Sequence, residues 1–296
     1  MTVAALAVQR QRRRVARRKL VSRVMLALAG LAAAIAVAPL IWIVGYVGLE
    51  GARQLSPEFL TALPTPVGVP GGGIANALVG SFMTVGLGLI VAAPVGLAAG
   101  VYAAARPDTR LGVTIRFATD TLAGVPSIVM GIFAYTIIVL PSRHFSAFSG
   151  GIVLAFIMLP TLIRTTEEML KLVPASLREG SLALGAPEWR TSLRVLIPAA
   201  INGILTGVML AVARGAGEAA PMLFTAFGNP FMNTDLNQPV ATLPHTVFVY
   251  AISPYEDWRA KAWATAFVLI AIVLLLNVAA RWLTSWRARR MGTLSG

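Results

Sequence analysis

Long apolar runs alternate along the chain with shorter segments rich in charged residues, proline or glycine. A transmembrane helix needs about 20 consecutive apolar residues. The pattern predicts six spans, at about 24–49, 74–104 (broken by Pro94), 122–140, a fourth beginning near Gly151, 196–227 and 260–282. We therefore expect an all-α, polytopic membrane protein with six transmembrane helices and both termini on the same side.

The first apolar run directly follows a basic segment, a pattern that signal peptides share. The run 24–49 is longer than the 7–15 residues of a signal-peptide core. We interpret it as an uncleaved helix, which makes 1–23 a basic cytoplasmic tail and 24–296 a single transmembrane domain. The simplest role of the tail's arginines is to hold the N-terminus in the cytoplasm.

Composition excludes several classes of protein. The chain is 57% hydrophobic and 12% charged, with a mean hydropathy of +0.76, whereas soluble domains carry about 25% charged residues. It has no cysteine and two histidines, which leaves no thiolate site and too few histidines for a metal cluster. We expect no metal, no cofactor and no catalytic residue. The net charge of +13 points to membrane lipid rather than nucleic acid, because hydropathy dominates.

The distribution of the 25 Lys and Arg residues fixes the expected orientation. Most of them fall in the N-terminal tail, the loops around 105–121 and 171–194, and the C-terminal segment. The six-span model places all of these segments on one side of the membrane. Since cytoplasmic loops carry the excess of Lys and Arg, both termini are expected in the cytoplasm.

Two apolar segments contain charges that a lipid-facing helix would not tolerate. The run 151–163 covers only about 20 Å, so the fourth helix must continue through Arg164 and Glu167 to cross a core of about 30 Å. In the fifth span, Arg214 and Glu218 have i, i+4 spacing. Such residues usually line a wet pathway, and arginine suits an oxyanion because it donates two parallel hydrogen bonds. The alternative is a pair of structural salt bridges.

Pairs of small residues predict where helices approach closely. Gly96 with Gly100, and Gly203 with Gly207, have the small-xxx-small spacing that brings helix backbones together in lipid.

The loop at about 174–194 predicts a short helix. Ser176 and Glu179 have the spacing of a capping box, and Gly185 is suited to end a helix. The segment is partly apolar although it lies in a cytoplasmic loop, so it either packs on the chain's own surface or binds a partner.

Several motifs resemble one family of transporters. Glu179-Gly-Ser-x-x-x-Gly185, with Ile197-Pro198 downstream, is similar to the EAA loop of binding-protein-dependent ABC importer permeases, although Gly180 and Ser181 replace the usual alanines. Over about 74–282 the chain resembles the A-type permeases of bacterial phosphate ABC importers, on motifs at 124–133, 164–179, 213–226 and 243–254. Ala219 departs from the family, which commonly has threonine there.

The resemblance implies the ABC importer permease fold and ATP-driven import of inorganic phosphate across the bacterial inner membrane. It implies four pathway residues, Arg164, Glu167, Arg214 and Glu218, and a coupling segment from Glu179 to Gly185 that contacts a dimeric ABC ATPase. The other implied partners are a second permease subunit of the C type and an external phosphate-binding protein.

The energy source is expected on another chain. A P-loop requires lysine followed by serine or threonine, and none of Lys19, Lys171 and Lys261 has that neighbour. The chain is therefore expected to be a transport subunit and not an enzyme. Two alternatives stay open: a permease for another oxyanion or nutrient, and an ion-coupled secondary transporter.

Reporter fusions test the six-span topology. Fusions after Arg194 and after Arg290 should report a cytoplasmic location, and a fusion after Asn237 an external one, because the basic loops remain inside. An external signal after Arg290 would contradict the six-span model.

Overall fold

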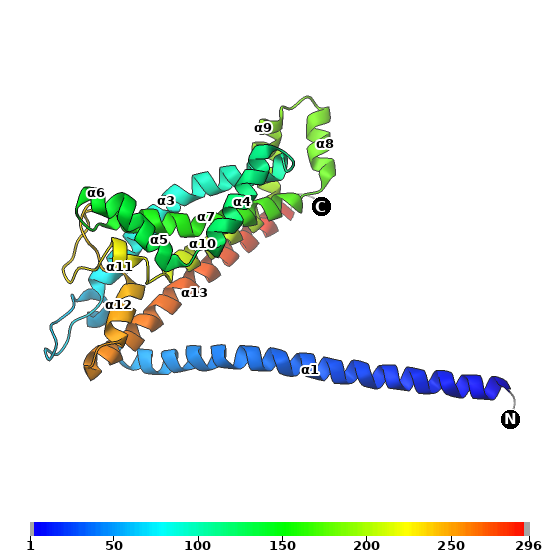
Figure 1. Ribbon diagram of the computed structural model, residues 1–296, viewed down its shortest axis with the longest axis horizontal. Coiled ribbons are helices and arrows are strands. Elements are labelled where there is room, and N and C mark those ends of the chain that lie inside the picture. Colours follow the sequence, from blue (N-terminus) through cyan, green and yellow to red (C-terminus); the bar gives the residue numbers. More distant parts are fainter. Residues whose placement is uncertain (1–2, 293–296) are drawn as a thin grey trace. The chain divides into compact units, whose positions relative to one another are not determined.

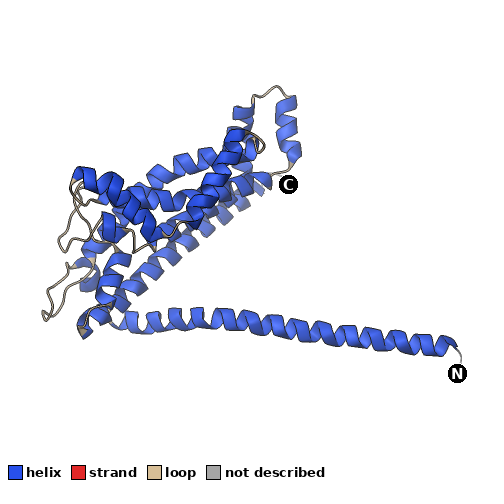
Figure 2. Cartoon of the chain, in the orientation of Figure 1, coloured by secondary structure: helices blue, strands red, loops and turns tan. Residues whose placement is uncertain are grey.

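The computed structural model describes residues 3–292, with the backbone alone for 3–14, 16, 280, 281 and 283–292. Within this range the regular structure is helical and contains no strand, which confirms the all-α class (Figures 1 and 2). In chain order the helices, with two π-helical segments written η, are α1 (Val3–Arg53), α2 (Pro57–Thr61), α3 (Ala75–Ala105), α4 (Arg110–Gly124), α5 (Ser127–Ala134), η1 (Tyr135–Val139), α6 (Leu140–Ser142), α7 (Ala147–Lys171), α8 (Ala175–Ala183), α9 (Glu188–Thr191), η2 (Ser192–Leu196), α10 (Ile197–Ala216), α11 (Met222–Thr225), α12 (Leu243–Ala251) and α13 (Glu256–Gly292).

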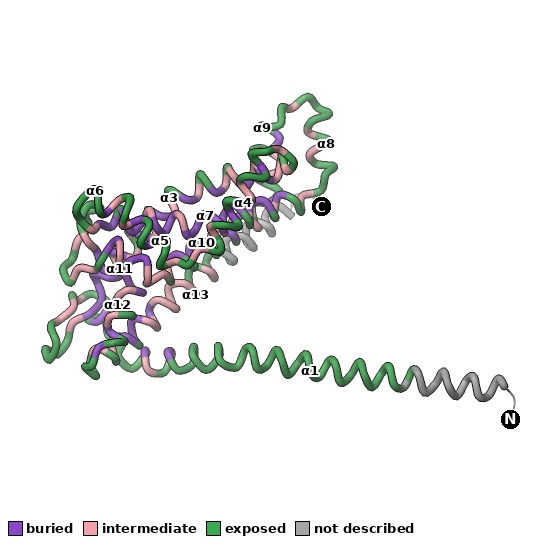
Figure 3. The backbone as a smooth tube through the Cα atoms, in the orientation of Figure 1, coloured by how far each residue is buried: buried purple, intermediate pink, exposed green. Residues whose placement is uncertain are grey.

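The chain divides into two compact units, and their boundary in the sequence lies between Glu50 and Gly51. The first unit contains α1 as far as Glu50, and the described side chains of this helix from Val15 to Tyr46 are all exposed (Figure 3). This helix contains the predicted span 24–49. The predicted division between residues 23 and 24 falls inside the continuous helix and stays a prediction. The side chains of the tail's first arginines are outside the described part of the structure, namely Arg10, Arg12, Arg13 and Arg14.

In the second unit, α7 is the central helix and packs against α3 and α10 (Figure 3). Glycines on α3 and on α10 allow both helices to pack closely against α7. A Cβ atom at Gly96 would lie 2.7 Å from Leu162 Cβ, and one at Gly100 would lie 2.6 Å from Thr166 Cβ. On α10 the neighbouring pairs are Gly203 with Met169, Gly207 with Thr165 and Gly215 with Met158. The predicted close approaches are confirmed, and the reversed order of the pairs shows that α7 and α10 are antiparallel.

Among the described residues, five helices are long and apolar enough to cross a membrane, and the number of crossings is six if a bent pair of helices counts as one span. The bent pair runs from Arg110 to Gly124 and from Ser127 to Ser142, with an angle of 103° between its parts. The prediction of one helix over 122–140 is therefore wrong. Pro126 explains the break, because it lacks a donor and keeps the preceding residue out of the helical region.

Two other predicted helix limits are also corrected. Pro94 lies inside α3, which continues through it to Ala105. The fifth span does not continue to residue 227, because α10 ends at Ala216 and only the short α11 follows. Glu218 consequently lies outside the helix that carries Arg214.

Substitution of Gly100 tests the packing of α3 on α7. Gly100→Leu should destabilise the fold by about 1–3 kcal/mol or more, because the larger side chain collides with Thr166. Gly86→Leu is a matched control on the same helix, since no atom lies within 4 Å of a Cβ there. Thermal unfolding of the purified variants in detergent measures the difference. Equal melting temperatures would contradict the close approach.

Candidate functional site

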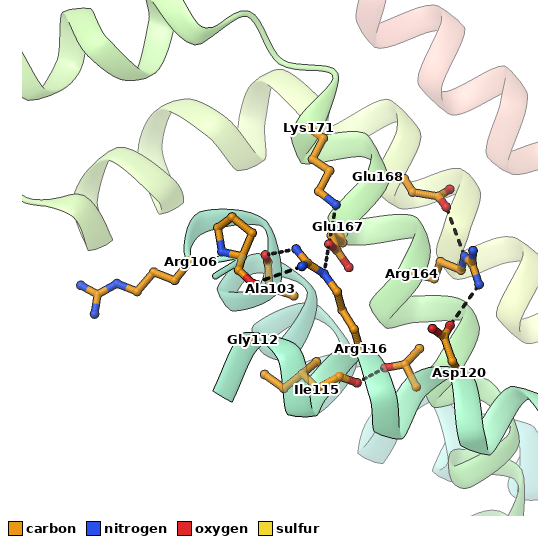
Figure 4. Close-up of polar contacts among 12 residues, drawn as sticks. Ala103, Arg106, Gly112, Ile115, Arg116, Asp120, Arg164, Glu167, Glu168 and Lys171 are labelled. Carbon is orange, nitrogen blue, oxygen red and sulfur yellow. Dashed lines mark hydrogen bonds and ion pairs between the residues drawn. The ribbon is translucent and has the colours of Figure 1, made fainter. Parts of the chain in front are cut away.

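Glu167 is the buried centre of an ion-pair cluster at the C-terminal end of α7 (Figure 4). Only 7% of the residue is exposed. Its Oε1 accepts hydrogen bonds from Arg116 Nε at 2.6 Å and from Lys171 Nζ at 2.5 Å. A buried carboxylate requires such partners, and here α4 supplies one and the next turn of α7 the other.

Arg116 also holds the backbone of the preceding turn. Its Nη2 donates to the Ala103 carbonyl at 2.9 Å, and its Nη1 donates to the Pro107 carbonyl at 3.1 Å (Figure 4). One guanidinium therefore connects the end of α3, the α3–α4 turn and α7. This fork geometry is available to arginine and not to lysine.

Arg164 lies one turn before Glu167 on α7 and is exposed, whereas Glu167 is buried. The side chain of Arg164 is 64% exposed, and it pairs with Asp120 at 3.2 Å and with Glu168 at 3.3 Å (Figure 4). Exposed pairs of this kind contribute about 0–1 kcal/mol. The guanidinium of Arg164 can therefore release these carboxylates and bind another oxyanion at low cost. The buried Glu167 cannot release its basic partners at low cost.

A small cavity of about 170 Å³ connects the two groups of ion pairs. It is lined by Arg116, Thr119, Asp120, Arg164, Glu167, Glu168 and Lys171. Its three basic and three acidic side chains balance, so an entering anion would have to displace a carboxylate from an arginine.

Arg214 and Glu218 do not form the predicted helical pair. Arg214 occupies the last turn of α10, and Glu218 follows the helix end at Gly217. Among the described residues the two side chains have no ion pair and no hydrogen bond. The salt-bridge alternative therefore has no support at this helix. Arg214 is favourably placed all the same, because the C-terminal end of a helix attracts a cation.

Helix α5, which follows the first break, packs against the segment that follows α10. A Cβ atom at Gly131 of α5 would lie 2.7 Å from Cα of Pro221, the residue before α11. Non-helical backbone at membrane depth is tolerated where protein or a cavity covers it, and discontinuous helices often border the substrate site of a transporter. The structure thus brings together two segments that are about 90 residues apart in the sequence.

The loop after α7 contains the expected short helix, α8, which ends in a left-handed glycine. Gly185 has φ +80°, its N–H donates to the Leu182 carbonyl, and the Ala186 N–H donates to the Ser181 carbonyl. This is the Schellman arrangement. The predicted capping box is wrong, because α8 starts at Ala175 and Pro174 occupies the N-cap position without a side-chain hydrogen bond.

Three members of the cluster were not predicted from the sequence. Arg116 and Lys171 were assigned to loops as topology signals, and Asp120 was not considered. The i, i+4 spacing of Glu167 and Lys171 is visible in the sequence, but the contact between α4 and α7 is not.

A comparison with family models decides the class of the protein. The model described as "Binding-protein-dependent transport system inner membrane component" matches residues 96–293. The chain belongs to this family. It is therefore a multi-pass membrane protein and a component of a transport system.

Individual relatives agree with the family. The chain is 46% identical over 244 residues to "Phosphate transport system permease protein PstA" of Yersinia pestis, covering 82% of each chain. It is 41% identical to the protein of the same name in Haemophilus influenzae, covering 89% of this chain and 94% of the other. The fold matches an inward-facing structure of the MetNI methionine ABC transporter with a TM-score of 0.58 and 18% identity, over 72% of this chain and 93% of that one.

Neighbouring carboxylates on α7 provide a test of the buried cluster. Glu167→Gln should destabilise this permease by up to ~3–5 kcal/mol, because it leaves Arg116 and Lys171 without their carboxylate. Glu168→Gln should cost less than ~1 kcal/mol, since its pair is exposed. Thermal unfolding of the two purified variants gives the comparison. Equal effects would show that the burial of Glu167 has no energetic consequence.

Proposed function

We propose that this chain is a permease subunit of an ATP-driven importer of inorganic phosphate. The observation that carries the proposal is its identity of 46% over 82% of its length to a phosphate transport permease. The arginines of the site agree with this substrate, because guanidinium groups bind phosphate oxygens in pairs. A permease for another oxyanion or nutrient is the alternative.

Arg164 and Arg214 are the proposed anion-binding residues of the pathway. Arg164 adjoins Thr165, which faces Gly207, and Arg214 adjoins Gly215, which faces Met158. The two arginines therefore lie at levels about 9 Å apart along the antiparallel pair of α7 and α10. Two cations at successive depths would pass an anion from one to the other.

The glutamates have different proposed roles. Glu167 supports the pathway indirectly, because it fixes Arg116 and Lys171 beside the cavity that Arg164 borders. Glu218 lies after the end of α10, close in sequence to Arg214, and can accept the proton of a protonated phosphate. Sulfate has no such proton at neutral pH, so this contact would favour phosphate.

The remaining assignments concern the assembly. We place the ATPase contact at α8, from Glu179 to Gly185, and the hydrolysis of ATP on that separate, dimeric chain. A second permease subunit of the C type and an external phosphate-binding protein complete the importer. Both termini, α8 and the Glu167 cluster are placed on the cytoplasmic side of the bacterial inner membrane, from the distribution of Lys and Arg.

Uptake of radioactive phosphate tests the pathway residues in cells that lack their own A-type permease. Arg164→Gln and Arg214→Gln should each lower uptake at least about tenfold, because a charged hydrogen bond contributes about 1.5–3 kcal/mol. Arg→Lys should restore little, since an ammonium group cannot make the paired contact.

Arg110→Gln is the matched control, because Arg110 is an exposed arginine at the start of α4 and outside the cavity. Membrane protein levels are measured in parallel. Wild-type uptake by Arg164→Gln and Arg214→Gln at normal levels would remove the pathway role, and inhibition by molybdate or sulfate as strong as by phosphate would favour the alternative substrate.

The coupling role of α8 is tested at its C-terminal glycine. No atom lies within 4 Å of a Cβ at Gly185, so only its φ of +80° restricts the residue. Gly185→Val should abolish phosphate-stimulated ATP hydrolysis by the assembled complex, because valine rarely adopts this φ. Gly185→Asn should retain most of it, because asparagine tolerates the left-handed region. Full activity in Gly185→Val would contradict the assignment.

A further inference from the structure

An open apolar groove of about 830 Å³ runs along the last turns of α3. One face of α3 forms its floor, with Leu97, Ala98, Val101, Tyr102 and Ala105 in the lining. These positions extend over about 12 Å of helix axis. The opposite wall comes from α8, α9, η2 and the start of α10, where Leu182, Leu193 and Ile197 are apolar members.

Charge is confined to one end of this groove. Arg106 follows the last residue of α3 and pairs with Glu188 at 2.9 Å. Arg178 of α8 donates to the Ala105 carbonyl at 3.4 Å, and the described residues provide no carboxylate within ion-pair distance of it. The lining therefore has two arginines for one glutamate. Arg190 adds a further positive charge at this end, above the Trp189 ring at 5.9 Å.

The position of the groove relative to the membrane follows from α3. The helix has 31 residues and is longer than the roughly 20 that a bilayer core requires. With the loop after α3 on the cytoplasmic side, as proposed from the distribution of Lys and Arg, the last turns of α3 lie at the level of the lipid headgroups, with Leu97 toward the hydrocarbon and Arg106 toward water. Trp189 is 62% exposed at the same level, and tryptophan is enriched at such interfaces.

We propose that this groove binds an anionic phospholipid. One acyl chain lies along α3 between Leu97 and Ala105, and the phosphate of the headgroup contacts Arg178. Basic pockets between membrane helices at the cytoplasmic surface recognise anionic headgroups in this way. The proposal concerns a lipid and does not depend on which solute the permease carries.

The lining favours a lipid over a protein partner. A surface that docks a protein segment offers hydrogen-bonding groups to that segment. The floor of this groove instead offers apolar side chains that continue into the span. On α8 only Arg178 and Leu182 border the groove, so its other residues remain available to a second protein, as does Leu184 directly after the helix, which is 90% exposed. Lipid binding and the proposed ATPase contact therefore use different sides of α8.

Photolabelling of the purified complex in nanodiscs tests the proposal. Two probes with the same diazirine-bearing acyl chain are compared, one with a phosphatidylglycerol and one with a phosphatidylcholine headgroup. Peptides from residues 97–106 and 188–197 should be labelled about fivefold more by the anionic probe, the preference that one basic residue provides. Equal labelling by the two probes would overturn the headgroup assignment without any substitution in the protein.

Two variants locate the lipid. Ala98→Trp fills the groove and should remove most of the labelling by both probes, while Arg178→Gln should remove only the preference for the anionic probe. Arg259→Gln, at the start of α13 and outside the groove lining, should leave both signals unchanged. Labelling that persists in Ala98→Trp would overturn the proposal. So would crosslinking of a photoreactive residue at position 98 to the ATPase or to a second permease instead of lipid.

Discussion

Close packing of α7 between α3 and α10 is the constraint on which the second unit depends. Lipid gives helices no hydrophobic reason to associate, so they associate where small residues let backbones approach. Glycines supply this contact on both neighbours, at Gly96 and Gly100 of α3 and at Gly203 and Gly207 of α10. The same packing fixes the rotation of α7 about its axis, which sends Glu167 into the protein and leaves Arg164 outside it.

Much of this architecture could be predicted from the sequence. Hydropathy located the apolar segments, although it missed the break before α5 and extended the fifth span beyond Ala216, and the small-residue spacing identified helix faces that meet. The short helix in the loop and its left-handed glycine were also predicted, since Gly185 is a local signal. Local signals were less reliable at the start of that helix, where Pro174 takes the cap position that Ser176 was expected to fill.

The site was predicted less completely, because its geometry depends on contacts between helices. Spacing alone suggested that Arg164 and Glu167 share a face and a function, yet they have separate partners on α4. Spacing also suggested that Arg214 and Glu218 form a pair, which the end of α10 at Ala216 prevents. In each case tertiary packing, and not the charge pattern, determines which side chains meet.

The three-way contact of Arg116 has a mechanical consequence. Its guanidinium binds two carbonyls around the α3–α4 turn and a buried carboxylate on α7. Sliding α4 along α7 would therefore break several charged hydrogen bonds at once. The ends of α3, α4 and α7 on this side thus form one stiff block. The block ends at Val125 and Pro126, where the chain turns by 103°, and α5 beyond this turn packs against α7 and α11 instead.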